Sequence, residues 1–139
     1  MKKLQWWFRL VGGFYLILTI INLYGIFINK GFLRQNLPFP VGDVGFGVTL
    51  DFWFTFVLDL LVMGGFLLWV SWKPLKNLNF VWLVIWLELI RGIADDLYMI
   101  ARGYHVSFYI VFITIHIIII VTGFIFAWQA SAQLSVSGN

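Results

Sequence analysis

Five of the six acidic residues lie inside long apolar stretches of the sequence, where an ionised side chain is costly. Only Asp43 falls in a connecting segment; the others are Asp51, Asp59, Glu88, Asp95 and Asp96. On insertion scales, each such group near the centre of a membrane-spanning helix costs about 2.5–3.5 kcal/mol. Ionisable residues at that depth bind ligands, carry protons or hold neighbouring helices together. These side chains are therefore the candidates for chemistry.

Three titratable residues fall at the same depth in three different apolar stretches. The second, third and fourth apolar stretches cover residues 50–70, 78–100 and 106–128, and their midpoints lie near residues 60, 89 and 117. Asp59, Glu88 and His116 each lie within one or two positions of these midpoints. Arg91 is less than one turn from Glu88, so its guanidinium could hold a carboxylate or a quinone oxygen while Glu88 or His116 exchanges a proton. The predicted midplane site consists of Asp59, Glu88, Arg91 and His116, with Asn22 and Thr19 as hydrogen-bonding neighbours.

A second polar group is predicted nearer the end of the third stretch. Glu88, Arg91 and Asp95 are three and four residues apart, so they share one helix face. We expect a shallower outer group on the side away from the chain termini, made of Asp51, Asp95, Asp96, Tyr98 and Arg102. Asp51 also opens its stretch, where the helix dipole favours a carboxylate, so it is interpreted as a helix cap.

Four apolar stretches of about 20 residues must position these groups. They cover residues 7–28, 50–70, 78–100 and 106–128, with a Pro- and Gly-containing interfacial loop at 29–49 and a short disordered tail at 129–139. The 139 residues are 62% hydrophobic and 11% charged, whereas soluble domains are about 25% charged. This composition excludes a water-soluble enzyme and a nucleic-acid binder. It predicts an all-α integral membrane protein, a four-transmembrane-helix bundle forming a single domain over residues 1–139.

Lysine and arginine residues near the ends of the stretches favour placing both termini in the cytoplasm. The side that holds the termini carries five of these residues and the other side three: Lys2, Lys3, Arg9, Lys73 and Lys76 against Lys30, Arg34 and Arg102. Positively charged ends stay in the cytoplasm. A belt of interfacial tryptophans is predicted at the same ends, made of Trp6, Trp7, Trp69, Trp72 and Trp128.

Each polar feature also has a purely structural interpretation. Glu88 and Arg91 could form an ion pair that fixes helix register, and His116 could be a hydrogen-bonded core histidine. The pairs Gly12-Gly13 and Gly64-Gly65 are typical of close helix packing, and Gly103 is expected to end the third helix. No metal is expected, because no helix carries the Glu-x-x-His spacing of di-iron bundles. Motifs of nucleophilic or phosphate chemistry are absent, so the sequence leans away from an enzyme.

Two segments carry a family resemblance. They are Lys2-Lys3-Leu4-Gln5-Trp6-Trp7-Phe8-Arg9-Leu10-Val11-Gly12-Gly13-Phe14-Tyr15 and Leu87-Glu88-Leu89-Ile90-Arg91-Gly92. Both resemble the bacterial BphX-like family, small four-span membrane proteins of unknown function, and the resemblance covers nearly the whole chain. The architecture is also similar to that of DoxX-type proteins. The resemblance implies a bacterial inner membrane, or its equivalent, and brings no assigned functional residues.

Two functions of different classes fit these features. In the first, the midplane site binds a small hydrophobic, aromatic or quinone-like ligand, or relays protons. In the second, the protein is a non-catalytic accessory subunit of a larger membrane complex, and the buried ions serve only packing. Membrane lipids are expected partners in both cases, and so is assembly into a homo-oligomer or a larger complex.

Overall fold

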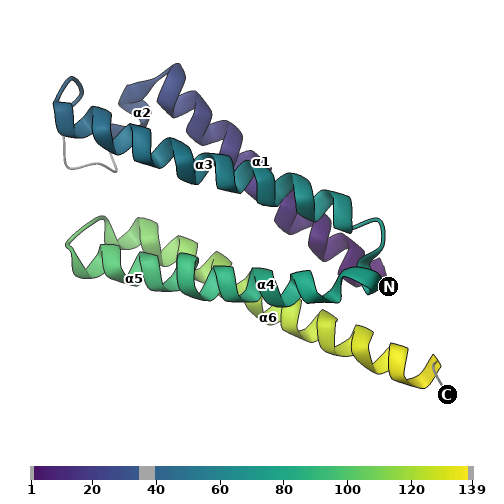
Figure 1. Cartoon of the computed structure of the whole chain (residues 1–139). Coiled ribbons are helices and arrows are strands. Elements are labelled where there is room, and N and C mark those ends of the chain that lie inside the picture. The colour runs from purple at the N-terminus through teal and green to yellow at the C-terminus, as the bar shows by residue number, and fades with distance from the viewer. Residues whose placement is uncertain (1, 35–39, 138–139) are drawn as a thin grey trace. The chain divides into compact units, whose positions relative to one another are not determined.

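The computed structural model describes residues 2–34 and 40–137, and every regular element within them is helical (Figure 1). The predicted all-helical class is confirmed. Four helical runs are long and apolar enough to cross a membrane: Lys2–Phe27, Val44–Val70, Pro74–Ala101 and Val106–Gln133. The elements are α1 (Lys2–Phe27), α2 (Lys30–Arg34), α3 (Val44–Val70), the 3-10 helix η1 (Pro74–Asn77), α4 (Leu78–Leu87), the π-helix η2 (Glu88–Ile93), α5 (Ala94–Ala101) and α6 (Val106–Ser137).

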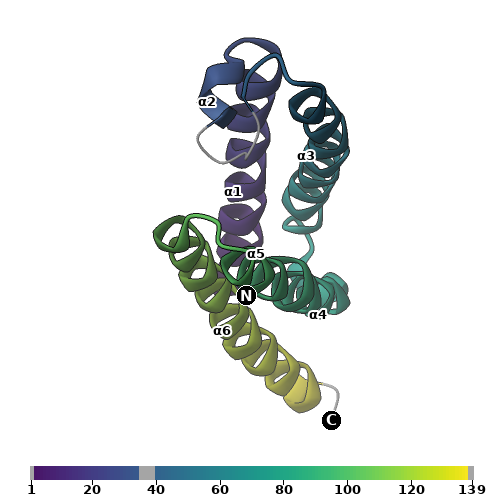
Figure 2. The same cartoon turned by 90° about the vertical axis from the view of Figure 1, so that its left-hand side faces the viewer.

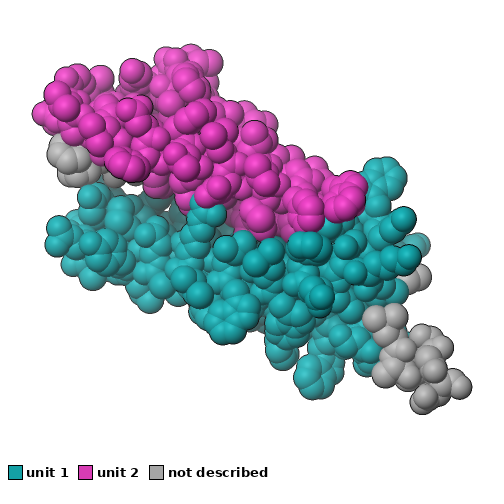
Figure 3. Space-filling view, in the orientation of Figure 1, with its two compact units in different colours: residues 1–8, 70–139 teal, residues 9–69 magenta. Residues whose placement is uncertain are grey.

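The helices form two compact units, coloured separately in Figure 3. Residues 9–69 make up the α1–α3 unit, which contains most of α1 together with α2 and α3. Residues 1–8 and 70–139 make up the α4–α6 unit. The first turns of α1 therefore pack with the later part of the chain, and each unit has its own internal contacts.

In the α1–α3 unit, the backbones of α1 and α3 approach each other at one pair of glycines. A Cβ placed on Gly12 would lie 2.9 Å from the Gly64 carbonyl oxygen, and a Cβ on Gly64 would lie 2.9 Å from the Gly12 carbonyl oxygen. The neighbouring Gly13 and Gly65 have nothing within 4 Å of such an atom. Small residues allow this kind of backbone approach between membrane helices. One glycine of each predicted pair thus makes the contact.

The connection predicted as an interfacial loop at 29–49 is partly helical. α2 occupies Lys30–Arg34, and its Leu33 side chain covers Gly25 of α1, within 2.6 Å of a Cβ placed there. Residues 35–39, the middle of the predicted loop, lie outside the described part of the chain. Apolar side chains from α1, α2 and α3 form a buried cluster at this end of the unit: Ile26, Leu33, Phe46, Leu50 and Val57.

α3 begins at Val44, earlier than the predicted residue 50, because Asp43 supplies its N-cap. The Gly45 N–H donates to Asp43 Oδ1 at 2.7 Å, and the Gly47 N–H donates to the Asp43 carbonyl oxygen at 3.2 Å. A carboxylate that accepts a first-turn N–H in this way is a favoured N-cap. Asp51 then lies in the third turn of the helix, too far from the free N–H groups to cap it. The prediction that Asp51 caps its helix is wrong.

In the α4–α6 unit, α4, η2 and α5 form one continuous helical rod that lies beside α6 in both views (Figures 1 and 2). The turn that reverses the chain begins at Gly103, which has φ +85°. The Gly103 N–H donates to the Ile100 carbonyl oxygen at 3.0 Å, and the Tyr104 N–H donates to the Met99 carbonyl oxygen at 3.1 Å. These two bonds form a Schellman motif, which needs the left-handed conformation that glycine adopts freely. The prediction that Gly103 ends the third helix is confirmed.

Trp7 fixes the first turns of α1 onto α6. Its Nε1 donates to Thr122 Oγ1 at 3.1 Å and to the Ile119 carbonyl oxygen at 3.3 Å. The indole ring covers Gly123, because a Cβ there would lie 2.7 Å from the ring. Trp7 is 4% exposed and packs inside the unit, whereas the other four predicted members of the tryptophan belt, Trp6, Trp69, Trp72 and Trp128, are exposed.

The last helix continues beyond the predicted end of the fourth stretch. α6 extends to Ser137, so the prediction of a disordered tail from residue 129 is wrong over residues 129–137. The segment Gln129–Gln133 contains good helix formers and neither glycine nor proline. Loss of hydrophobicity therefore ends the apolar stretch without ending the helix. Residues 138–139 lie outside the described part of the chain.

Candidate functional site

A carboxylate and an imidazole from two neighbouring elements meet inside the α4–α6 unit. Glu88 opens the π-helix η2 and is 2% exposed. His116 lies in the middle part of α6, and its side chain is 15% exposed. The Nδ1 atom of His116 makes a short hydrogen bond with Glu88 Oε2. These two residues, predicted to lie at the same depth, are therefore in direct contact.

A second carboxylate approaches the opposite nitrogen of the same imidazole. Asp96 Oδ2 lies 3.5 Å from His116 Nε2, within ion-pair distance. Asp96 belongs to the first turn of α5 and is 7% exposed. Among the described residues, its Oδ2 atom is buried with no hydrogen-bond partner. His116 is thus held between two buried carboxylates, and one carboxylate oxygen still has an unused capacity to bind a proton or a donor.

Gly92 provides the space for the imidazole ring. A Cβ placed on Gly92 would lie 2.7 Å from Nδ1 of His116 and 2.8 Å from both Cε1 and Cγ. Ordinary van der Waals contact begins at 3.4 Å, so only a residue without a side chain allows the ring to lie here. The glycine therefore sets how far His116 enters the helical rod and how closely it approaches Glu88.

The π-helix explains why Asp96, and not Asp95, reaches the histidine. In an α-helix, residues four apart drift by about 40°, so Glu88 and Asp96 would lie roughly 80° apart around the axis. η2 contains wider turns, as in the hydrogen bond from the Ala94 N–H to the Leu89 carbonyl oxygen five residues earlier. A wider turn cancels the drift, and Glu88, Gly92 and Asp96 are all buried. Single π-turns of this kind are frequent at functional sites.

This register shift corrects the predicted grouping of the acids. The sequence pattern places Glu88, Arg91 and Asp95 on one face and Asp96 in an outer group. In the structure Asp96 contacts the inner histidine, while Asp95 has an exposed side chain within electrostatic reach of Arg91. Depth along the sequence places Asp96 in the outer group, whereas the structure brings its carboxylate within 3.5 Å of His116 Nε2.

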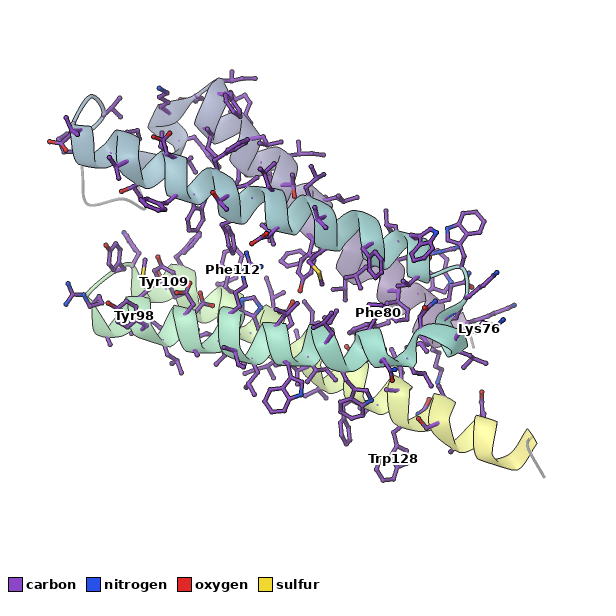
Figure 4. All side chains as sticks on the ribbon, in the orientation of Figure 1. Lys76, Phe80, Tyr98, Tyr109, Phe112 and Trp128 are labelled. Atoms are coloured by element: carbon purple, nitrogen blue, oxygen red, sulfur yellow. The ribbon has the colours of Figure 1, made fainter. Side chains whose placement is uncertain are left out.

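Aromatic side chains continue the site toward the turn between α5 and α6. Phe112 lies one turn before His116, with ring centroids 6.4 Å apart, and Phe108 lies 4.9 Å from Phe112. The adjacent Tyr109 is partly buried and lies within electrostatic reach of the Asp95 and Asp96 carboxylates. Tyr109 and Phe112 project from α6 in Figure 4, where Tyr98 of α5 is also labelled near the turn.

Three of the other predicted midplane residues, Thr19, Asn22 and Asp59, belong to the α1–α3 unit. Thr19 Oγ1 donates to the Tyr15 carbonyl oxygen at 2.9 Å, one turn earlier on its own helix. Asn22 Nδ2 donates to the Leu18 carbonyl oxygen at 2.8 Å, and its Oδ1 accepts from Trp53 Nε1 at 2.8 Å. The hydrogen bonds described for these two residues therefore stay within their unit.

The remaining predicted residues divide by exposure. Asp59 lies on α3 with an exposed side chain, as does Asp51 two turns before it. Arg91 is half-buried on η2, three residues after Glu88. Tyr98 is exposed on α5, and Arg102 is exposed at the C-cap of the same helix.

The site that the structure assembles consists of Glu88, Asp96 and His116, lined by Gly92, and we call it the carboxylate–histidine site. A neutral imidazole carries one N–H, so it donates to one carboxylate and accepts from the other when that one is protonated. Such an arrangement can store a proton or pass one across the ring. Within the described residues, no group of three His, Cys, Asp or Glu side chains is arranged to hold a metal ion.

Comparison with known proteins gives one family. The sequence profile of the BphX-like family matches residues 1–133, which includes every residue of the carboxylate–histidine site. No curated protein and no solved structure matches the chain. The predicted similarity to DoxX-type architecture stays a prediction. Since the match covers nearly the whole sequence, the chain belongs to the BphX-like family.

Proposed function

We propose that this chain is an integral membrane protein of a bacterial inner membrane, with four transmembrane helices and both termini in the cytoplasm. The support is four helices of sufficient length and apolarity, with large hydrophobic side chains exposed along them, such as Ile20, Val62, Trp86 and Ile118. Such surfaces are unfavourable in water but suit the hydrocarbon core of a bilayer. The excess of lysine and arginine at the ends nearest the termini supports the orientation.

We propose further that the carboxylate–histidine site exchanges a proton with a small lipophilic ligand. One observation carries this proposal: His116 lies between two buried carboxylates, and Asp96 Oδ2 has no hydrogen-bond partner among the described residues. Packing alone would favour satisfying every polar atom, because an unsatisfied buried group costs about 1–3 kcal/mol. A group left in this state within an apolar environment is typical of a functional site.

The proton path follows from the two nitrogens of the ring. When Glu88 is protonated and His116 carries its proton on Nε2, Glu88 passes a proton to Nδ1 while Nε2 passes its proton to Asp96. The ring keeps one proton and changes tautomer, and the net charge of the site is unchanged. Asp96 then holds a proton that it can deliver to a ligand oxygen, and the reverse sequence takes one up.

The ligand class is inferred from the side chains next to the site. The rings of Phe108 and Phe112 lie on the same helix as His116 and suit a flat aromatic or quinone-like molecule. Arg91, on the same π-helix as Glu88, is the proposed anchor for a carboxylate or carbonyl oxygen. A molecule of this kind partitions into the bilayer and reaches the site without crossing water.

Native mass spectrometry of the protein extracted from its own membrane tests this function. We expect a bound small molecule on the wild-type protein and its loss in Glu88→Gln and in His116→Gln, with unchanged helix content by circular dichroism. Asp51→Asn is the matched control, because it also converts a carboxylate to an amide on a long apolar helix. Retention of the ligand in both site variants, or its absence from the wild-type protein, would contradict the proposal.

The alternative function, an accessory subunit without chemistry of its own, is supported by an exposed aromatic ladder on α4 and α6. Trp82 and Phe124 have ring centroids 5.7 Å apart, and Phe124 and Trp128 are 6.1 Å apart. All three side chains are exposed, and Trp128 is labelled in Figure 4. This ladder could pack against a helix of a partner. A defined heteromeric assembly in the same mass spectra, lost in Trp82→Ala and Trp128→Ala, would favour this alternative.

A further inference from the structure

A groove lies between the first turn of α1 and the last turns of α6. Its volume is about 300 Å³, and its lining comes from both helices: Lys2, Lys3, Leu4, Phe126, Gln129, Ala130 and Gln133. All of these residues belong to the α4–α6 unit. Trp7 fixes the two helices against each other one turn away, through its hydrogen bond to Thr122. The groove is thus part of a fixed contact between helix ends.

The lining is apolar beneath and cationic at the rim. Leu4 and Ala130 are buried, Phe126 is partly buried, and together they give a hydrophobic floor. Lys2 and Lys3 are exposed and line the groove from α1, and the exposed Gln129 and Gln133 line it from α6. The described residues that line the groove include no acid, so they give it a net positive charge. A suitable ligand carries a negative group next to an apolar one.

The position of the groove selects the source of such a ligand. Lys2 begins the first candidate membrane span, and Gln133 ends the last one. In the proposed membrane placement, the groove therefore lies at the level of the lipid headgroups on the cytoplasmic side. Basic pockets between transmembrane helices at this level bind anionic lipid headgroups.

From this geometry we infer that the groove between α1 and α6 binds the headgroup of an anionic phospholipid. The lysine ammonium groups contact the phosphate, the two glutamine amides donate to its oxygens, and the start of the acyl region covers Leu4 and Phe126. The inference rests on the proposed membrane placement and is independent of the carboxylate–histidine site. The lipid would also tie the first turns of α1 to the end of α6.

Lipid binding to the full-length protein in mild detergent tests the inference. By native mass spectrometry, we expect phosphatidylglycerol to bind at least tenfold more tightly than phosphatidylcholine. A lysine in contact with the headgroup contributes about a factor of five to anionic lipid binding, so the double variant Lys2→Gln/Lys3→Gln should bind phosphatidylglycerol about 25-fold more weakly. Circular dichroism checks that its helix content matches the wild-type value.

The matched control is Lys73→Gln/Lys76→Gln, which removes the same charge from exposed lysines outside the groove; Lys76 is labelled in Figure 4. We expect this variant to bind phosphatidylglycerol less than threefold more weakly than the wild-type protein. Equal losses in both double variants would overturn the inference, because they would indicate a general surface charge effect. Glycerol phosphate that competes as well as the intact lipid would also overturn it, by assigning the groove to a free phosphate compound.

Discussion

Substitution of Gly92 by alanine tests whether the π-helix and His116 fit together as described. The added Cβ would lie 2.7 Å from His116 Nδ1 and must move the ring to at least 3.4 Å, a displacement of about 0.7 Å. Overpacking a buried site in this way costs about 1–3 kcal/mol. The higher helix propensity of alanine relative to glycine stabilises the helix by about 1 kcal/mol and partly offsets this cost. We expect a net destabilisation of up to about 2 kcal/mol and a weakened contact between His116 and Glu88.

The matched control is Gly65→Ala, because Gly65 is also helical and has nothing within 4 Å of its added Cβ. The propensity gain is then common to both variants, and Gly92→Ala should be less stable than Gly65→Ala by about 1–3 kcal/mol. Unfolding in mixed micelles with increasing sodium dodecyl sulfate, followed by circular dichroism, measures the difference. A double-mutant cycle with His116→Ala identifies its origin, because the penalty should disappear when the ring is absent. Equal stability of Gly92→Ala and Gly65→Ala would refute the reasoning.

Three further predictions concern helix contacts and a helix cap outside the site. Gly64→Ala should destabilise the α1–α3 contact by about 1–3 kcal/mol in the same unfolding assay, because its Cβ would meet the Gly12 carbonyl oxygen; a value equal to that of Gly65→Ala would contradict this. Trp7→Phe removes the indole N–H that donates to Thr122 and should lower the free energy of unfolding by about 1 kcal/mol. Thr122→Val should give a similar loss, and the double variant should lose less than the sum of the two; full additivity would count against the hydrogen bond. Asp43→Ala should lower the free energy of unfolding by about 1 kcal/mol and speed hydrogen exchange at the Gly45 amide, because the N-cap is lost. Asp43→Asn should retain the cap, and unchanged exchange in the alanine variant would contradict the prediction.

Much of the architecture follows from local sequence. Runs of apolar residues about 20 long predict the four long helices, and Gly103 correctly predicts the end of α5. Depth matching along the sequence pairs Glu88 with His116, because antiparallel neighbours of equal length place their midpoints side by side, and the two side chains are in contact. These inferences depend on helical periodicity and on helix length alone.

The remaining features depend on departures from regular periodicity. Asp96 joins the site although it is predicted in the outer group, because η2 widens the helix, and the signal for this is the four-residue spacing of Val84, Glu88, Gly92 and Asp96. A π-turn departs from regular α-helical hydrogen bonding, and η2 packs against α6, so helical periodicity alone does not predict it. The burial of Trp7 likewise depends on a glycine more than 110 residues away, at position 123.

The helix ends are also set by side-chain chemistry and not by hydrophobicity. Asp43 caps α3 from within the connecting segment, so the helix starts before the apolar stretch begins. The residues after Trp128 are less apolar than the span but include good helix formers such as alanine and glutamine, so α6 continues through them. Apolar stretches therefore predict where a span lies in the bilayer, whereas caps and helix propensities decide how far the helix extends.

The most direct test of the central claim is the protonation pattern of His116. The chain has only two histidines, so ¹⁵N-histidine NMR of the protein in micelles gives two sets of ring resonances, which a His105→Gln variant assigns. If His116 bridges Glu88 and Asp96, its ring nitrogens should shift in both Glu88→Gln and Asp96→Asn, with Nδ1 most affected by the first and Nε2 by the second. The His105 resonances should stay in place. Ring resonances of His116 that are the same in the wild-type protein and in both variants would contradict the account.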